Sequence, residues 1–316
     1  GDGASASPLE LIQVSRRLDE WRHFLRVQGR DALEFWLLPG LAMVLPWRLC
    51  FAVFKRLARW SWLYRDGVEA AAREAQARGW LGLDADAWRV RRRLITLVDH
   101  ADFFLAATRG KAWMRQHLKV EGDWPARGQA GILCTFHWGT GTFGLRHAGL
   151  SGMRAHAMVA GLDSPAYQGR PLLMAYARRR VAMVVRETGQ PTLDASGSLR
   201  AIPQVLRDGD QVLAVVDVPT DELSAAVQVE LLDARALMPR GLLRMAVQRQ
   251  IPMTLYLTGL DTETGARWLR IRPIGVYDDV EALVVRVFGE LDEAIRAEPW
   301  SWHFWAQAPR FWVEGG

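Results

Sequence analysis

Cysteine is scarce in this sequence: Cys50 and Cys134 are the only two among 316 residues. Neither has the spacing to histidine or to another cysteine that a zinc site or a disulfide framework requires. The sequence therefore predicts no metal site, and its low cysteine content is compatible with a reducing, cytoplasmic location. Cys134 lies inside an apolar run, where we expect a buried side chain rather than a nucleophile.

Long apolar runs are also missing. Within residues 35–62 the longest charge-free stretch covers residues 35–47 and contains Pro39 and Pro46, whereas a membrane-spanning helix needs about 20 apolar residues. The first ten residues also lack the basic-then-apolar layout of a secretory signal. We predict a kinked hydrophobic helix or hairpin over residues 35–62 that lies in a bilayer surface, with a buried core helix as the alternative.

Nucleic-acid-binding motifs are not recognisable, although the chain is basic, with a net charge of +5 and a pI of about 9.6. The positive charges are scattered along the chain, so we expect no nucleic-acid partner. A basic chain suits other anionic partners, such as phospholipid headgroups or a phosphopantetheine-linked donor. An arginine-rich composition without a special partner is the alternative.

Tryptophan, in contrast, is abundant, with 15 residues. Tryptophan beside basic side chains is typical of proteins that contact a membrane interface. For any single tryptophan, packing in the core is the alternative. The tryptophans concerned are Trp36, Trp47, Trp60 and Trp62, and the basic residues near them are Arg48, Lys55, Arg56 and Arg59.

The hydrophobic pattern changes near Val120. Before this point the spacing of apolar residues predicts helices and no strand, and after it short apolar runs alternate with helical stretches. Such alternation is typical of a mostly parallel sheet covered by helices on both faces. We therefore predict an α/β fold, with a mostly parallel central sheet flanked by helices in residues 119–316 and a helical, membrane-associating region in residues 1–118.

The individual elements follow from the same pattern. The expected helices cover residues 9–28, 67–79 and 84–108 in the N-terminal region, and 164–180, 198–208, 240–249 and 279–297 beyond it. The expected strands cover residues 131–136, 155–160, 181–185, 211–218, 227–232, 253–259 and 268–276.

Candidate site residues come after the apolar runs, because ligands of open α/β sheets bind beyond the carboxyl ends of the strands. His137 follows the run at 131–136 and precedes Gly139 and Gly141, where a substrate can approach the backbone closely. Asp217 lies near the end of the run that starts at residue 211. A structural histidine and a turn-capping aspartate are the alternatives.

Two groups of arginines are candidate anion-binding residues. Arg178, Arg179 and Arg180 follow an expected helical stretch, and Arg240 opens the helix expected at 240–249. Guanidinium groups bind phosphate through paired hydrogen bonds, and helix N-termini favour anions. A solvated surface is the alternative for the run of three.

Several segments together resemble the lysophospholipid acyltransferase superfamily, and in particular its lipid A lauroyl/myristoyl transferase branch. GILCTFHWGTGTFG is similar to the first signature block, in which a catalytic histidine follows a strand, and RDGDQVLAVVDVP to a later block in which a strand ends in an acidic residue. VELLDARALMPRGLLRMAVQRQIPMTLYL and LDEAIRAEPWSWHFWAQAPRFW are similar to the following strands and to the closing helix. The resemblance covers nearly the whole chain.

This resemblance implies an enzyme that moves an acyl chain from a thioester of acyl carrier protein or coenzyme A to a hydroxyl or amine of a lipid or amphiphilic acceptor. His137 would be the general base of a direct transfer, since histidine titrates near neutral pH, and no cofactor is implied. Amides around Gly139 and Gly141 would help to hold the oxyanion, and Arg179 or Arg180 would match the anion-binding arginine. The implied location is the cytoplasmic face of a bacterial inner membrane, with peripheral or shallow insertion.

One departure from the family pattern concerns the acid that usually follows the histidine by five positions. That position is Thr142, and no carboxylate occurs in residues 138–153. A threonine can orient an imidazole but cannot offset its charge. Asp217 is the best candidate to replace the acid, because the resemblance places its strand beside that of His137; a backbone carbonyl that orients the ring is the alternative.

The same departure makes ordinary lipid A synthesis doubtful as the function. We expect an acyltransferase of a specialised lipid or secondary-metabolite pathway. A catalytically degenerate member that binds lipid or acyl carrier protein in a biosynthetic complex is the main alternative, and a thioesterase-like hydrolase is another.

Overall fold

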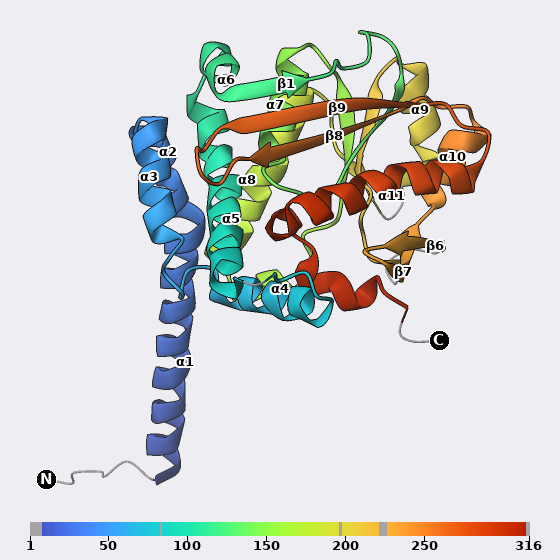
Figure 1. Ribbon diagram of the computed structural model, residues 1–316. Helices are drawn as coiled ribbons and strands as arrows, with labels where there is room; N and C mark the ends of the chain where they lie inside the picture. The colour runs from blue at the N-terminus through green and yellow to red at the C-terminus, as the bar shows by residue number, and fades with distance from the viewer. Residues whose placement is uncertain (1–7, 83, 196–197, 221–225, 314–316) are drawn as a thin grey trace, which may run out of the picture.

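The computed structural model describes residues 8–82, 84–195, 198–220 and 226–313 (Figure 1). Its central element is a seven-stranded sheet in the order β1-β9-β8-β2-β5-β3-β4. All neighbouring strands run parallel except β8 and β9, which confirms the α/β class with a mostly parallel sheet. The strands are β1 (Leu118–Glu121), β2 (Gly131–Thr135), β3 (Ala155–Val159), β4 (Leu193–Asp194), β5 (Gln211–Val215), β8 (Met253–Leu260) and β9 (Arg267–Gly275).

The centre of the sheet is apolar on both sides. Successive residues of a strand point to opposite faces, and in β2 the side chain of Leu133 joins one core cluster whereas those of Ile132 and Cys134 join the other. All residues of β2 are buried. A continuous apolar run such as 131–136 is therefore what a parallel strand covered by helices on both faces requires.

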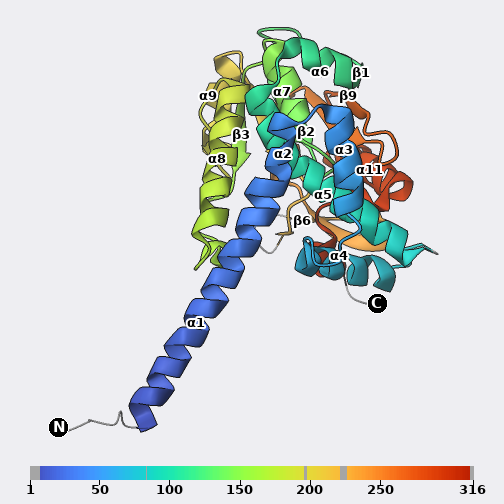
Figure 2. The same cartoon turned by 90° about the vertical axis from the view of Figure 1, so that its left-hand side faces the viewer.

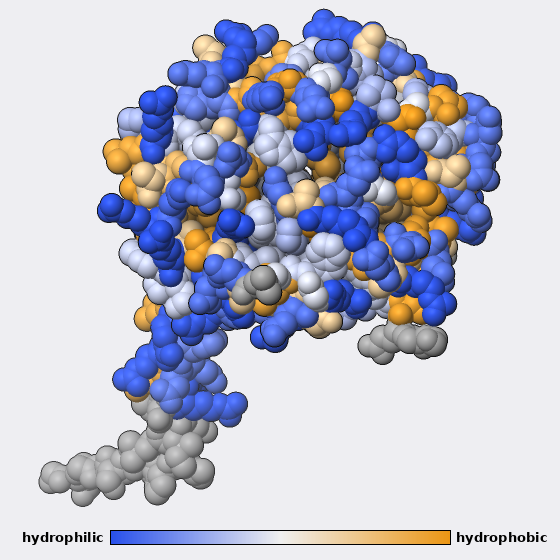
Figure 3. All heavy atoms as spheres, in the orientation of Figure 1, coloured by the Kyte–Doolittle hydropathy of each residue, from blue (hydrophilic) through white to orange (hydrophobic). Residues whose placement is uncertain are grey.

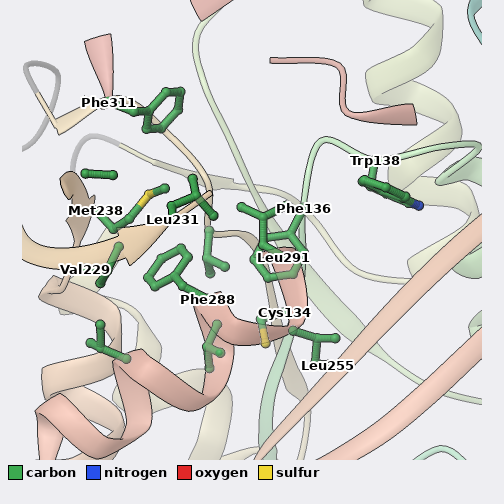
Figure 4. Close-up of a cluster of buried hydrophobic side chains, with 14 of the residues drawn as sticks. Cys134, Phe136, Trp138, Val229, Leu231, Met238, Leu255, Phe288, Leu291 and Phe311 are labelled. Carbon is green, nitrogen blue, oxygen red and sulfur yellow. The ribbon is translucent and has the colours of Figure 1, made fainter. Parts of the chain in front are cut away.

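Helices cover the two faces of the sheet in separate groups. One group comprises α9 (Ile202–Arg207), α10 (Gly241–Gln248) and α11 (Val280–Ala297), which contribute to the cluster around Cys134 and Leu255 shown in Figure 4. The other group comprises α5 (Ala85–Thr108), α7 (Thr142–Leu150) and α8 (Pro171–Thr188), which pack near Leu133 and Leu213. Short 3-10 turns cover Pro165–Tyr167, Ser198–Arg200, Pro299–Ser301 and Trp305–Arg310.

The expected strand at 181–185 is wrong, because these residues belong to α8. A short run of valine, alanine and methionine has no periodicity that separates a buried strand from a helix. The helix continues through this run until Gly189, whose positive φ of 69° ends it, and the Gly189 amide donates to the carbonyl of Val185. Such a left-handed glycine is a common helix terminator.

The run at 227–232 forms a strand, but outside the main sheet. β6 (Ala226–Leu231) pairs antiparallel with β7 (Ala234–Pro239), a strand that the sequence pattern did not predict. Leu232 and Asp233 connect them with positive φ angles of 53° and 62°, as a two-residue turn requires. The hairpin packs on α11 through Leu231, Met238 and Phe288 (Figure 4).

The N-terminal region consists of helices joined by turns, and its described residues form no strand before Leu118. A long helix, α1 (Pro8–Ala32), continues through a π-helical turn (Leu33–Leu37) into α2 (Leu38–Val44), and its first half projects away from the rest of the molecule (Figures 1 and 2). α3 (Trp47–Leu57), α4 (Arg65–Ala77) and α6 (Lys111–His117) complete this region. The break predicted within residues 35–62 occurs at Pro46, which precedes α3 in an extended conformation.

These helices share a core with the sheet. Phe54 of α3 and Val98 of α5 lie in the same buried cluster as Leu213 of β5 and Ile271 of β9. The helical region ends at His117, and β1 begins at Leu118. The change of secondary structure at this point therefore does not separate two hydrophobic cores.

The tryptophans near basic residues occupy different environments. Trp47 is buried, and its indole N–H donates to the carbonyl of Gly265 at 3.0 Å, so for this residue the core alternative holds. Trp60 and Trp62 are exposed and lie 5.7 Å apart between ring centroids. Figure 3 shows apolar side chains scattered among charged ones on one face. None of the helices in the described part of the chain is both long and apolar enough to cross a membrane.

Candidate active site

His137 and Asp217 meet because their strands are in register. In the β2–β5 pair, Thr135 lies opposite Val215, and each candidate residue comes two positions later. The imidazole Nδ1 of His137 lies 2.9 Å from Oδ1 of Asp217. The predicted placement of Asp217 beside His137 is therefore confirmed.

The same carboxylate also fixes the backbone of the histidine. The amide of His137 donates to Oδ1 and Oδ2 of Asp217 at 2.9 and 3.1 Å. Asp217 is fully buried, whereas the His137 side chain keeps 32% of its surface exposed. A buried acid that bonds Nδ1 leaves Nε2 as the ring atom available for proton transfer.

A C-terminal segment, residues 301–304, closes the other side of this pair. The indole N–H of Trp302 donates to Oδ2 of Asp217 at 2.9 Å. The Gly139 amide donates to the carbonyl of Ser301 at 2.9 Å, and the His303 amide to that of His137 at 2.7 Å. Segment 301–304 therefore runs antiparallel to residues 137–139, and Trp138 and Trp302 form a β-bridge between them.

Phe304 contacts the ring of His137 directly, and Arg92 holds the backbone around segment 301–304 in place. The Phe304 ring stacks on the His137 imidazole, with centroids 3.7 Å apart and planes inclined by 12°. The buried Arg92 guanidinium donates to the carbonyls of Trp300, Trp302 and His303 at 2.9–3.2 Å. Sequence reasoning missed all of these contacts; the aromatic density of SWHFW at 301–305 was the only signal.

His303 is a second histidine of the site. Its Nε2 lies 2.7 Å from the carbonyl of Gly139. Burial, followed by the nearby charge of Arg92, lowers the pKa of His303 to about 4. A neutral imidazole whose Nε2–H donates to this carbonyl therefore supports the loop after His137.

Gly139 and Gly141, the two glycines that follow His137, have different structural roles. Gly139 has a φ of 55°, and a Cβ on it would lie 2.2 Å from the carbonyl oxygen of Thr258, so only glycine fits. Because its amide already donates to Ser301, the expected oxyanion role of Gly139 is replaced by a conformational one. Gly141 lines the cavity described below, and its amide has no acceptor within the described ranges.

Thr142, at the position where the acyltransferases that the sequence resembles have an acid, does not take the place of that acid. It lies in the first turn of α7, is buried and lines the cavity. Its hydroxyl oxygen has no hydrogen-bond partner among the residues that the structure describes. The expected catalytic part of Thr142 in orienting the imidazole is therefore wrong, since Asp217 occupies Nδ1 of His137.

A cavity of about 360 Å³ opens beside His137. It lies between β2, β3 and β5 on one side and α7 and α8 on the other, and most of its wall is apolar. The apolar lining includes Leu145, Ala157, Val159, Met183, Val184, Leu213 and Tyr256. Its volume and apolar lining can accommodate a hydrocarbon chain.

Three of the candidate anion-binding arginines, Arg179, Arg180 and Arg240, lie in different places. Arg180 lines the cavity, but its Nη1 donates to Oδ2 of Asp99 at 2.8 Å. Although burial raises the pKa of Asp99, the adjacent Arg180 outweighs it and lowers the pKa to about 2. The positive charge of Arg180 is therefore largely offset by Asp99, whose carboxyl group stays ionised at neutral pH.

Arg179 and Arg240 lie outside the cavity lining. Arg179 is exposed, and its guanidinium lies 4.8 Å from the ring centroid of Trp36. Arg240 precedes α10, on the opposite face of the sheet from α7 and α8. Its expected part in this site is wrong, because the β6–β7 hairpin directs the chain to that other face before α10 begins.

Cys134 is buried as predicted, on the side of β2 that faces α11 (Figure 4). Burial raises its pKa to about 12, so its thiol stays protonated at neutral pH and does not act as a nucleophile. Within the described ranges, no group of three or more histidine, cysteine or acidic side chains has a geometry that would hold a metal ion.

Comparisons with protein families and with proteins of curated function assign no role to this site. No protein-family model matches the chain, and no match is found among proteins of curated function.

Proposed function

We propose that this protein is an acyltransferase that moves an acyl chain from an acyl carrier protein or coenzyme A thioester to a hydroxyl or amine of an amphiphilic acceptor. The observation that carries the proposal is that His137, which is bonded to the buried Asp217, lines an apolar cavity. A base with a buried acid behind it suits activation of a weak nucleophile. The apolar cavity suits the acyl chain.

In the proposed reaction Nε2 of His137 removes the proton of the acceptor as the acceptor oxygen or nitrogen attacks the thioester carbon. Asp217 stabilises the imidazolium that forms, because its carboxylate accepts from Nδ1. The tetrahedral intermediate then collapses, the carbon–sulfur bond breaks, and the imidazolium returns the proton to the leaving thiolate. No covalent acyl-enzyme is formed, and the buried thiol of Cys134 takes no part.

The amides at the start of α7 are the candidate oxyanion donors. Gly141 precedes this helix and lines the cavity close to His137 in sequence, and its amide has no acceptor among the described residues. Unpaired amides at a helix N-terminus stabilise developing negative charge. This part of the proposal assigns to Gly141 the role that Gly139 does not have.

We further propose that the protein acts at the cytoplasmic face of a bacterial inner membrane, bound peripherally. The projecting half of α1 exposes Leu18, Trp21 and Leu25 among basic residues, and Trp60 and Trp62 are exposed near α3. Apolar and basic side chains together favour an interfacial position. The missing acid after His137 favours a specialised lipid or secondary-metabolite acceptor over lipid A.

The proposal is tested by mass spectrometry of lipid and metabolite extracts from cells that produce the wild-type chain or the His137→Ala variant. An acylated product should appear only with the wild-type chain. If both proteins are folded and the two extracts match, the acyltransferase proposal is wrong.

A further inference from the structure

A second hollow, lined by arginines, lies next to the cavity of His137. It has a volume of about 230 Å³ and is formed by residues of α1, α4 and α5 together with Arg170, which precedes α8. We call it the arginine cleft and define it by four of its lining residues, Arg30, Arg65, Arg92 and Arg170.

Two of these arginines are paired with acids. Nη1 of Arg30 lies 2.7 Å from Oδ2 of Asp66. Nη2 and Nε of Arg170 donate to the fully buried Asp31 at 2.5 and 3.0 Å. These pairs fix the walls of the cleft and offset most of the charge of Arg30 and Arg170.

Arg65 and Arg92 have no acidic partner at ion-pair distance among the residues that the structure describes. Asp99 attracts Arg92 from farther away, but it is already paired with Arg180. Arg65 is exposed at the start of α4, and its side chain has no ion pair or hydrogen bond to any part of the chain that the structure describes. Arg92 is buried and bonds only backbone carbonyls, at three of its five N–H positions. Burial lowers the pKa of Arg92 only to about 10, so it remains charged at neutral pH.

The acids of the cleft do not cancel this excess. Glu34 lines it, but burial raises the pKa of Glu34, and its Oε1 accepts from the amide of Tyr64 at 2.7 Å. Asp66 is mostly exposed and already faces Arg30. The cleft therefore favours an anion between Arg65 and Arg92.

His303 connects the cleft to the candidate active site. Its side chain lines both hollows. The cleft is smaller than the roughly 300–1,000 Å³ that drug-sized ligands occupy, so it suits one compact group rather than a whole ligand. An anionic group in the cleft would lie across His303 from the cavity that holds His137.

We propose that the arginine cleft binds the phosphate group of the substrate whose acyl transfer takes place at His137. A phosphate offers three acceptor oxygens and close to two negative charges, and guanidinium groups match its geometry through paired hydrogen bonds. The identity of the rest of the ligand rests on the proposed function. The phosphate belongs either to the phosphopantetheine arm of the donor or to the headgroup of the acceptor.

Isothermal titration calorimetry on the full chain tests the proposal without turnover. The two probes are 4′-phosphopantetheine and a short-chain phosphatidic acid below its micelle concentration, and pantetheine, which lacks the phosphate, is the control ligand. At least one phosphate probe should bind, more weakly at high salt, and pantetheine should not. The probe that binds identifies which substrate brings the phosphate.

Two variants should change the affinity in opposite directions. Arg65→Gln should weaken binding about tenfold, the size of effect expected for a lost charge-assisted hydrogen bond. Asp66→Asn should strengthen binding several-fold, because it removes a negative charge from the wall of the cleft, and a merely destabilised protein would not bind more tightly. Arg73→Gln, at an exposed position of the same helix outside the cleft, is the matched control and should bind as the wild type does.

Absence of binding by both phosphate probes would overturn the inference, as would equal affinities of the Arg65→Gln and Arg73→Gln proteins. Neither outcome bears on His137, whose part is tested by product formation. Conversely, phosphate binding that depends on Arg65 supports the cleft even if no acyl transfer is found, and only the acyl part of the ligand would then be withdrawn.

Discussion

The ring of Phe304 lies flat on the imidazole of His137, 3.7 Å away between centroids. Together with the bond from Nδ1 to Asp217, this stacking leaves the imidazole a single orientation. We expect Phe304→Leu to lower kcat about tenfold or more, because small errors in the placement of a base reduce the rate strongly. KM should change little, and Phe304→Tyr should retain most of the rate since it keeps the ring. Equal rates for the leucine and tyrosine variants would show that the stacking does not position the base.

Asp217→Asn should lower the rate per folded molecule by about 10²–10⁴, the range typical of acid–base groups. The asparagine can still accept from the amide of His137, but it cannot stabilise an imidazolium. Turnover is measured together with the urea midpoint, since the buried position also contacts Trp302. A loss of stability with an unchanged rate would instead mean that Asp217 only fixes the backbone.

Thr142→Val tests whether Thr142 takes any part in the proposed reaction. The buried hydroxyl of Thr142 has no partner in the described parts of the chain. Its replacement by a methyl group should therefore raise the free energy of unfolding, by about 1 kcal/mol, or leave it unchanged. The rate should stay within about twofold. A much larger loss of rate in the valine protein would assign the hydroxyl to the substrate.

Acid should destabilise the fold through its buried neutral histidines. Burial lowers the pKa of His100 to about 3, whereas an unfolded histidine titrates near 6.5. Between about pH 6.5 and pH 3 the unfolded chain therefore binds a proton that the folded chain does not. The contribution of His100 to the free energy of unfolding should fall by up to about 1.4 kcal/mol for each pH unit below 6.5.

The measurement compares urea unfolding of the wild type and His100→Asn at several pH values. Asparagine keeps an acceptor for the hydroxyl of Tyr176, which now bonds Nδ1 of His100 at 2.7 Å. Burial raises the pKa of Glu34 and Glu298, which act in the opposite direction, so the difference between the two curves is the relevant quantity. A difference that stays constant from pH 6.5 to pH 4 contradicts the prediction.

We expect the protein to bind membranes through the exposed apolar residues of α1. Flotation should recover the protein with anionic liposomes, and less of it at high salt, since each basic residue near such a surface contributes on the order of 1 kcal/mol. The double variant Trp21→Ser, Leu25→Ser should reduce the bound fraction about tenfold. Val285→Ser, at an exposed site on α11, is the control. A protein that stays in solution at low and high salt would exclude an interfacial role.

The parallel sheet and the positions of His137 and Asp217 after its strands were predictable because they depend on local pattern. Apolar runs identified β2, β5 and β8, and a parallel sheet brings the residues after neighbouring strands to one edge. That the strand of Asp217 lies beside the strand of His137 followed from the resemblance to the acyltransferase superfamily, since the apolar pattern does not give the strand order. The strand predicted at 181–185 was wrong because the apolar residues there fit a buried strand and a helix equally well.

The rest of the site depends on contacts between distant parts of the chain. Trp302 bonds Asp217 across 85 positions, and Arg92 holds the carbonyl of Trp302 across 210. No spacing rule connects such residues in one sequence. The roles of Gly139 and Trp47 were missed for the same reason, because their amide and indole donors bond Ser301 and Gly265.

The bridge between residues 137–139 and segment 301–304 has a consequence for the order of events during synthesis on the ribosome. His137 and Asp217 are both translated well before Trp302 and Phe304, so the nascent chain carries the pair long before the groups that orient it. A nascent chain that stops before Trp302 therefore lacks the ring that covers the imidazole and the indole that bonds the carboxylate. We expect the proposed site to be complete only after residues 301–304 have been translated and have docked beside residues 137–139.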